Sequence, residues 1–248
     1  MKGTKTGAKT IKTLIVVLII AALAAGLAFL MQKQLLNRLF VGSRDVCGVD
    51  VSHYQGEIDW QKLNSQGIRF AYIKATEGSS YTDDYYAINL AGAKEAGIVP
   101  GAYHFFSFDS PAETQAQHFI DVVGDLDGEL IPVIDVEFYG NSGNNPPDKD
   151  ELKAHLSEML DILEEHYGCK PVIYSTFIFY HEYLYEGFED YPLWLRNVYF
   201  PPFEKCAVWQ YTSRLRLDGF NGAERYIDGD VLKGVTLEEM TVKAEPDE

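Results

Sequence analysis

The feature that most constrains the fold is an alternation of short apolar segments, rich in β-branched and aromatic residues, with longer helix-like segments. From Cys47 onward, eight segments have the length and composition of buried strands. They are 47–51, 68–74, 98–105, 130–137, 171–175, 193–195, 207–211 and 226–228. Most are separated by a helix-like stretch, and this order is typical of a parallel sheet. The sequence therefore predicts an α/β fold, a TIM-like barrel that uses most of the 248 residues.

Capping residues mark the expected helix ends. Ser110, Pro111 and Glu113 have the spacing of an N-cap, a first helical position and a capping box. Asp148 is expected to cap a longer helix that ends at Gly168. That helix carries one apolar stripe, formed by Leu152, Leu156, Met159 and Leu163.

The segment 130–137, Leu-Ile-Pro-Val-Ile-Asp-Val-Glu, ends in two carboxylates separated by one residue. In a strand, Asp135 and Glu137 project from the same face with Cα atoms about 7 Å apart. Repulsion and partial burial then favour one neutral acid beside an ionised partner, which is the arrangement glycosidases use. The motif taken alone is also explained by two solvated acids at an exposed strand end.

Polar or aromatic residues stand at the ends of the other expected strands, and in a parallel barrel these ends converge on one mouth. The candidates are Asp50, Lys74 with Glu77, Tyr103, Tyr174, Trp194, Trp209 and Asp228. Carboxylates beside aromatic rings suit a sugar, whose hydroxyls bond to acids while its C–H faces stack on rings. Core packing explains the two tryptophans equally well. The six histidines show no metal-ligand spacing, so neither a metal site nor a cofactor is expected.

The N-terminal region contains an apolar run from Thr13 to Met31, 19 residues without a charge, which would be about 28 Å long as a helix. Four lysines precede it, so the positive-inside rule places residues 1–12 in the cytoplasm and everything after the span outside the cell. We expect a single-pass anchor at 13–31, followed by a basic stalk at 32–45. A cleaved signal peptide is the alternative, because 22–24 is Ala-Leu-Ala.

Charge and cysteine content exclude other classes. Residues 45–248 contain 14 basic and 37 acidic residues, a net charge of −23, so nucleic acid is not an expected partner. Three cysteines allow one bridge at most. We expect Cys47 and Cys206 to lie near the bottom rim of the barrel and to pair. The barrel is expected at 46–233, with an acidic tail at 234–248.

Several motifs, in chain order, together resemble the glycoside hydrolase family 25 lysozymes, the N-acetylmuramidases. They are Gly48-Val-Asp-Val-Ser-His-Tyr-Gln-Gly56, Ile73-Lys-Ala-Thr-Glu-Gly78, Gly101-Ala-Tyr-His-Phe105, Asp135-Val-Glu137, Trp209-Gln-Tyr211 and Ile227-Asp228. The resemblance implies an irregular β/α barrel that cleaves the β-1,4 bond between N-acetylmuramic acid and N-acetylglucosamine in peptidoglycan, with retention. By this resemblance, Glu137 is the general acid/base, Asp135 its partner, and Asp50 and Asp228 complete the acidic cluster. The aromatic candidates match substrate-lining positions.

The sequence departs from the family pattern at two places. Leu-Arg-Asn at 195–197 replaces small residues, and Asp230 replaces an Asn. These departures bear on glycan specificity more than on the reaction. The nucleophile is either Asp135 or the 2-acetamido oxygen of the substrate, and Asp-x-Glu strand ends favour the second.

Two other functions are weighed against a muramidase. A wall-binding module with little turnover would not need all four acids. A glycosidase of another N-acetylated polysaccharide is disfavoured, because Ile131 and Val133 replace the acids of a longer Asp-rich run. The expected partners are peptidoglycan glycan strands and, through one N-terminal helix, the membrane.

Overall fold

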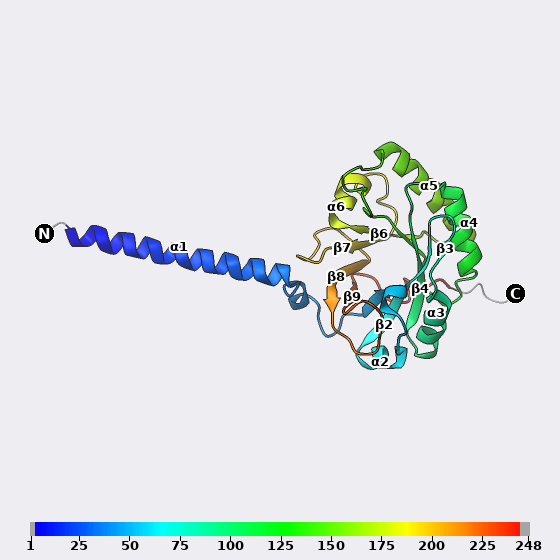
Figure 1. Ribbon diagram of the computed structural model, residues 1–248, viewed down its shortest axis with the longest axis horizontal. Helices are drawn as coiled ribbons and strands as arrows, with labels where there is room; N and C mark the ends of the chain where they lie inside the picture. The colour runs from blue at the N-terminus through cyan, green and yellow to red at the C-terminus, as the bar shows by residue number, and fades with distance from the viewer. Residues whose placement is uncertain (1–2, 244–248) are drawn as a thin grey trace.

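Nine strands form one sheet in the computed structural model, which describes residues 3–243, with side chains from Lys9 onward (Figure 1). The strands are β1 (Cys47–Val51), β2 (Ile68–Glu77), β3 (Tyr81–Thr82), β4 (Val99–Phe105), β5 (Val133–Asp135), β6 (Val172–Thr176), β7 (Leu193–Arg196), β8 (Val208–Leu215) and β9 (Ile227–Leu232). Their order is β1-β9-β8-β7-β6-β5-β4-β2-β3, and β1 also pairs with β2. That pairing closes eight strands into a barrel and confirms the expected fold class, with β3 as a short addition to β2.

Helices cover the barrel and extend from it. They are α1 (Gly3–Gln32), α2 (Trp60–Ser65), α3 (Tyr86–Glu95), α4 (Ala112–Val123), α5 (Lys149–Tyr167) and α6 (Phe177–Phe179), with the short turns η1 (Asn37–Leu39), η2 (His53–Gln55) and η3 (Tyr180–Leu184). α3, α4 and α5 lie on the side of the barrel away from α1 (Figure 1). Asp148 caps α5 through the backbone N–H groups of Asp150 and Glu151, and Gly168 ends it in a left-handed conformation, as expected. The apolar stripe of α5 is buried.

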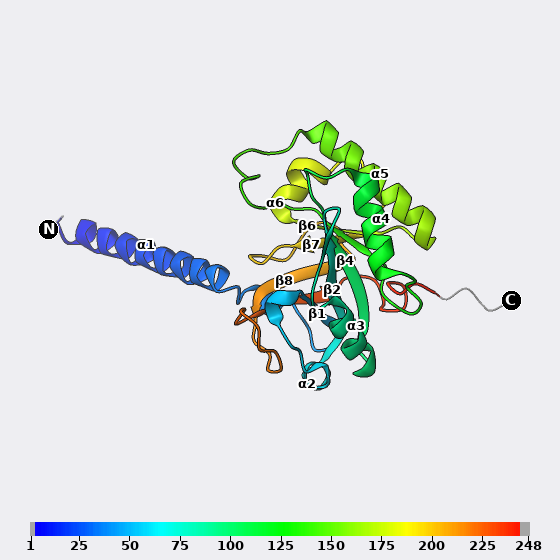
Figure 2. The ribbon, with the colours of Figure 1, turned by 45° about the vertical axis from the view of Figure 1, so that its right-hand side comes forward.

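α1 projects alone from the domain (Figures 1 and 2). Residues 9–32 have the length and hydropathy of a helix that crosses a bilayer, and none of the most hydrophobic stretch is buried within the chain. This helix is compatible with a membrane anchor or a signal sequence.

The parallel order expected from the alternation of strands and helices does not extend to the last strand, and the barrel is irregular, as the family resemblance implies. β9 is antiparallel to both β1 and β8, because β8 and β9 are joined by a hairpin and not by a helical crossover. The β7–β8 pair is parallel, although no helix covers its connection. The barrel is therefore irregular over β7–β9, and its helices cover the other strands.

The capping box expected at Ser110 does not form. α4 begins at Ala112 with Pro111 as its N-cap, and no side chain caps it. The Gln115 side chain instead holds the loop before α4. It accepts a hydrogen bond from the Ser107 N–H at 2.7 Å and donates one to the Ser110 carbonyl at 2.9 Å.

Residues on both sides of the expected barrel segment are packed against it. Gln34 and Asn37, in the expected stalk, are buried against the barrel. In the expected tail, Met240 is buried and its carbonyl accepts from the Ile131 N–H at 2.8 Å, so the packed domain extends well beyond residue 233. Residues 1–2 of the expected basic segment and 244–248 of the expected tail lie outside the described residues.

The predicted Cys47–Cys206 bridge is wrong, since Cys47, Cys169 and Cys206 are all free thiols. Cys47 is in β1 and Cys206 precedes β8, and β9 lies between those strands. Two strand spacings of about 4.8 Å exceed the Cα separation of about 7 Å that a disulfide allows.

Alternate side chains along the strands point to opposite faces of the sheet and so form two parts of the core, one inside the barrel and one beneath the helices. Phe70, Tyr72 and Trp194 fill the barrel interior, where the Tyr72 and Trp194 rings stack with centroids 4.8 Å apart. The intervening residues, such as Ala71 and Ile73, face the helices. The aromatic interior therefore forms a floor beneath the carboxyl ends of the strands.

Candidate active site

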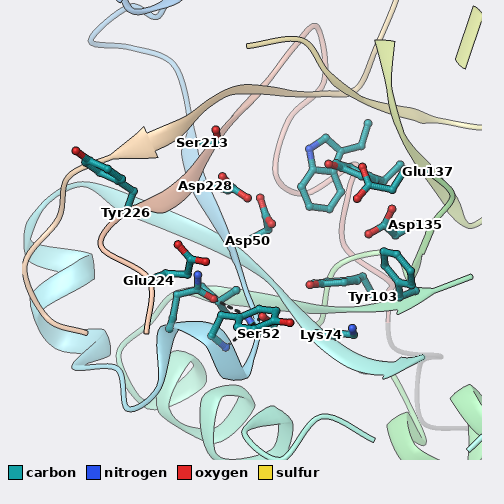
Figure 3. A pocket seen from close by; sticks show the side chains of 16 residues that line it. Asp50, Ser52, Lys74, Tyr103, Asp135, Glu137, Ser213, Glu224, Tyr226 and Asp228 are labelled. Atoms are coloured by element: carbon teal, nitrogen blue, oxygen red, sulfur yellow. Dashed lines mark hydrogen bonds between the residues drawn. The ribbon is translucent and has the colours of Figure 1, made fainter. Parts of the chain in front are cut away.

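A cavity of about 430 Å³ opens above this floor, at the carboxyl ends of the strands (Figure 3). The four acids expected at the mouth, Asp50, Asp135, Glu137 and Asp228, all line it. Asp135 and Glu137 lie on one side and Asp50 and Asp228 on the other (Figure 3). The other lining residues are Val51, Ser52, Tyr54, Gln55, Lys74, Tyr103, Phe105, Tyr174, Trp194, Ser213, Glu224 and Tyr226. A cavity of this size accommodates a small ligand or a few sugar units.

Backbone pairing fixes the end of β5 that carries two of these acids. The Asp135 carbonyl accepts from the Phe106 N–H at 2.9 Å, and the Val136 N–H donates to the Tyr174 carbonyl at 3.0 Å. The Ser175 hydroxyl donates to the Val136 carbonyl at 2.8 Å. Val136 is buried in the core on one face, so Asp135 and Glu137 both point into the cavity from the other.

Burial is the main electrostatic feature of this pair. It raises the pKa of Glu137 from 4.5 to about 7. Burial also raises the pKa of Asp135 well above its ordinary value, and the charges of Glu137 and Asp50 raise it further. The pair therefore resists double ionisation and retains a proton near neutral pH, as the sequence led us to expect.

Asp50 is held by a chain of hydrogen bonds. Gln210 donates from Nε2 to Asp50 Oδ2 at 2.6 Å, and the Tyr174 hydroxyl donates to Gln210 Oε1 at 3.1 Å. Burial raises the pKa of Asp50 to about 6, and the hydrogen bond from Gln210 opposes that rise. Burial thus favours the neutral form of Asp50, whereas the hydrogen bond from Gln210 favours its carboxylate.

Two further acids on β9 adjoin Asp50. Asp228 is its register partner on the antiparallel strand, and burial followed by the Asp50 charge raises its pKa well above the usual range. Asp230, one of the positions that depart from the family pattern, is fully buried and accepts from Trp194 Nε1 at 2.9 Å. Burial and the Asp50 charge also raise the pKa of Asp230 well above its ordinary value. Trp194 thus helps to hold the acidic cluster as well as lining the cavity.

Arg196 belongs to the other segment that departs from the family pattern, and it places a positive charge near the acids. It lies two residues after Trp194 on β7 and so on the same face of the strand. Its guanidinium lowers the pKa of Glu137 against the dominant effect of burial. Burial lowers the pKa of Arg196 itself, but the negative charges of nearby groups, Glu137 and Asp228 among them, raise it overall.

Lys74 and Tyr103 line the cavity, but Glu77 does not. Lys74 Nζ lies 2.6 Å from Glu77 Oε2, and it also lies 4.9 Å from the centre of the Phe105 ring. Glu77 therefore contacts the site through Lys74.

Trp209 lies outside the cavity. Its neighbour Gln210 points into the barrel toward Asp50, so the alternation of the strand turns Trp209 outward. There it is fully buried and donates from Nε1 to the Asn197 carbonyl at 2.9 Å. His104 is turned outward in the same way next to Tyr103, and burial lowers its pKa to about 4.

Sequence reasoning did not single out Glu224 and Tyr226, which reach the cavity from the hairpin between β8 and β9. This hairpin docks on η2, where the Gly222 N–H donates to the Gln55 carbonyl at 2.8 Å and the Glu224 N–H donates to the Tyr54 carbonyl at 3.2 Å. A Cβ at Gly222 would collide with the Tyr54 carbonyl. No local sequence pattern predicts this contact, because it joins segments more than 160 residues apart.

The chain is similar to several known proteins. The sequence profile described as glycosyl hydrolases family 25 matches residues 49–220. The structure of a family 25 glycosyl hydrolase from Bacillus anthracis is similar, with a TM-score of 0.74 and 45% identity over 80% of this chain and 94% of that chain. Protein YegX of Escherichia coli K12 is 38% identical over 207 residues, which cover 80% of this chain and 73% of that protein. The autolytic lysozyme of Clostridium acetobutylicum is 29% identical over 197 residues, 77% of this chain and 58% of that protein.

Proposed function

This chain belongs to the glycosyl hydrolases family 25, and from that premise we propose that it is a membrane-anchored, retaining N-acetylmuramidase in which Glu137 is the general acid/base. Its general activity, hydrolysis of peptidoglycan by a lysozyme-type glycoside hydrolase, follows from the family. The observation that carries the finer proposal is the cavity mouth, where Asp135 and Glu137 face Asp50 and Asp228 (Figure 3).

Glu137 suits proton transfer to the leaving oxygen of the glycosidic bond. Burial raises its pKa to about 7, so a substantial fraction of its carboxyls stays protonated at neutral pH. A general acid is most effective when its pKa lies near the working pH. After the leaving group departs, the Glu137 carboxylate takes a proton from the water that completes hydrolysis.

Asp135 acts on the sugar from the same strand end as Glu137. Inversion needs a water held by a carboxylate on the opposite face of the sugar ring, whereas Asp135 and Glu137 both enter the cavity from the same strand face, which favours retention. We propose that the 2-acetamido oxygen of the substrate is the nucleophile and that Asp135 orients it. Direct attack by Asp135 is the alternative, and the two differ in their dependence on the acetamido group.

Asp50 and Asp228 lie opposite this pair and face the charge that develops on the sugar. Asp50, with a pKa of about 6, supplies a negative charge at neutral pH beside an oxocarbenium-like transition state. The hydrogen bond from Gln210 holds its carboxylate in place, so little reorganisation is needed during the reaction.

α1 is the proposed anchor. Four lysines precede its apolar run and no acid does, which favours a cytoplasmic N-terminus and a barrel outside the cell. Flotation of the full chain with membranes, combined with protease protection of an N-terminal tag, tests this topology. Recovery of a shortened protein from the medium, beginning near Ala25, would instead identify a cleaved signal peptide.

Reducing-end analysis tests the reaction. Peptidoglycan digested by the full chain in detergent micelles should carry new N-acetylmuramic acid reducing ends, and the anomer formed first should retain the β configuration. New N-acetylglucosamine ends would assign a different bond. Binding to the wall without new ends would assign a binding module.

A further inference from the structure

The segment that follows α1 is locked to the barrel. Asn37 is fully buried, and its Nδ2 donates to the Asn197 carbonyl at 2.8 Å and to the Tyr211 carbonyl at 2.9 Å. A single side chain therefore ties the segment both to the loop after β7 and to β8. Buried side-chain donors of this kind are costly to leave unpaired, so the contact is a specific one.

Gln34 makes a second attachment, next to the cavity. Its Oε1 accepts from the Ser213 N–H at 2.7 Å and from the Thr212 hydroxyl at 2.9 Å. Gln34 has a φ of 55°, a conformation that residues other than glycine rarely adopt. Ser213 lines the cavity (Figure 3), so the hydrogen bond from its N–H to Gln34 attaches the segment after α1 to the cavity wall.

The irregular part of the barrel explains why the segment docks there. No helix follows β7 or β8, so the outward side chains of these strands, including Leu195, Trp209 and Tyr211, need another cover. Val41 packs on this cluster, and Asn37 binds the adjoining carbonyls. Residues 34–41 thus occupy the place that a barrel helix takes elsewhere.

We propose that residues 33–41 and the loop 197–203 form a collar that rests on the lipid headgroups and holds the cleft at the membrane surface, so that the enzyme cuts glycan lying next to the membrane. The proposal rests on α1 being the anchor. α1 ends at Gln32, and the two residues to Gln34 span at most about 7 Å. The headgroup layer on each side of a bilayer is of similar thickness, about 5–7 Å.

The side chains that the collar exposes suit a lipid interface. Leu39, Phe40, Tyr199 and Phe203 are exposed, Phe203 by 92%. Aromatic and apolar side chains of this kind are common at the headgroup level. In Figures 1 and 2 the loop after β7 projects toward the end of α1, which brings both parts of the collar to one face.

Charge distinguishes this face from the rest of the domain. Residues 32–44 contain three basic residues, Lys33, Arg38 and Arg44, and no acid, whereas residues 45–248 carry a net charge of −23. The three basic side chains are exposed. An anionic lipid surface therefore attracts the collar and repels the remainder of the domain.

Photocrosslinking in vesicles that contain phosphatidylglycerol tests the collar. Benzoylphenylalanine is incorporated in the full chain in place of Phe203 or, as the control, in place of Ile88, which is 64% exposed on α3 on the opposite side of the domain. We expect lipid adducts at position 203 and none at position 88. Equal adducts at both positions, or none at 203 in protein that floats with the vesicles, would overturn the proposal.

A variant with a spacer after α1 changes the distance between the collar and the membrane without changing the contacts between the collar and the barrel. A flexible Gly-Ser spacer of about 20 residues between Gln32 and Lys33, with an r.m.s. span of about 25 Å, leaves every contact of the collar with the barrel in place. The yield of lipid adducts from benzoylphenylalanine at position 203 should then fall. An undiminished yield would contradict the claim that the short connection sets the distance to the membrane.

Turnover gives an independent measure. The unspaced chain should cleave glycan oligomers tethered to lipid in its own vesicle and act poorly on the same oligomers held on beads, and the spacer should raise bead hydrolysis. Equal cleavage of both by the unspaced chain would refute the proposal while leaving the muramidase assignment intact. Failure of the chain to float with vesicles would refute the anchor, whereas failure to form new reducing ends would refute the activity.

Discussion

Replacing Glu137 with Gln tests the proposed chemistry and its electrostatic basis together. The amide keeps the shape of the side chain but neither donates an acidic proton nor ionises. Glu137 lies in the cavity beside Asp135, and burial dominates its raised pKa. The same substitution should therefore lower activity and raise stability, each in a predictable pH range.

The effect on turnover follows from the role of the proton. Loss of a general acid costs about 10²–10⁴-fold, so Glu137→Gln should lose that much activity on peptidoglycan. An aryl leaving group of low pKa needs little protonation, so the first step on such a substrate should be partly restored. Asp135→Asn should show no such rescue, because orientation of the nucleophile is still required.

The effect on stability has the opposite sign. A carboxyl whose pKa is raised in the folded state binds extra protons there, so wild-type stability falls as pH rises from 4.5 to about 7. At about 1.4 kcal/mol for each pKa unit, the cost at pH 8 is at most about 3.5 kcal/mol, and it vanishes below pH 4.5. Glu137→Gln removes this cost, so its advantage should appear at pH 8 and not at pH 4.

Urea unfolding of the full chain in micelles at the two pH values, with tryptophan fluorescence as the signal, measures this difference. Glu158→Gln, an exposed substitution on α5, is the matched control and should change the free energy of unfolding little at either pH. A Glu137→Gln variant no more stable than wild type at pH 8 would refute the burial argument. Undiminished hydrolysis of peptidoglycan by that variant would refute the acid assignment.

Three further substitutions test the surroundings of the cavity. Arg196→Gln removes a charge that lowers the pKa of Glu137, so the basic limb of the kcat/KM profile should move from near pH 7 to higher pH; an unmoved limb would show that the two do not interact. Asp230→Asn keeps an acceptor for Trp194 and removes a buried acid, so urea unfolding at pH 8 should show equal or greater stability, and a loss of more than about 1 kcal/mol would contradict this. Gly222→Ala should undock the β8–β9 hairpin, costing about 1–3 kcal/mol in urea unfolding and raising KM; unchanged values of both would refute the contact.

The sequence determined the strand content and the central pair of acids. Eight apolar segments indicated the barrel strands, because their short length and their content of β-branched and aromatic residues separate a buried strand from a helix. Asp135 and Glu137 were found in the same way, since two residues one apart in a strand share a face in any fold that buries the strand. Asp50 and Asp228 followed from the resemblance and from their strand-end positions.

Only the tertiary structure decided which residues of β7, β8 and β9 enter the site and which face outward. The inward turn of Gln210 sends Trp209 out of the site, and the antiparallel entry of β9 places Asp230 where Trp194 binds it. The same irregular strands leave a bare outer face that the segment after α1 covers through Asn37. These contacts join residues that are 36 to 160 positions apart. Local periodicity carries no information about them, because which strand edges meet is fixed only when the barrel closes.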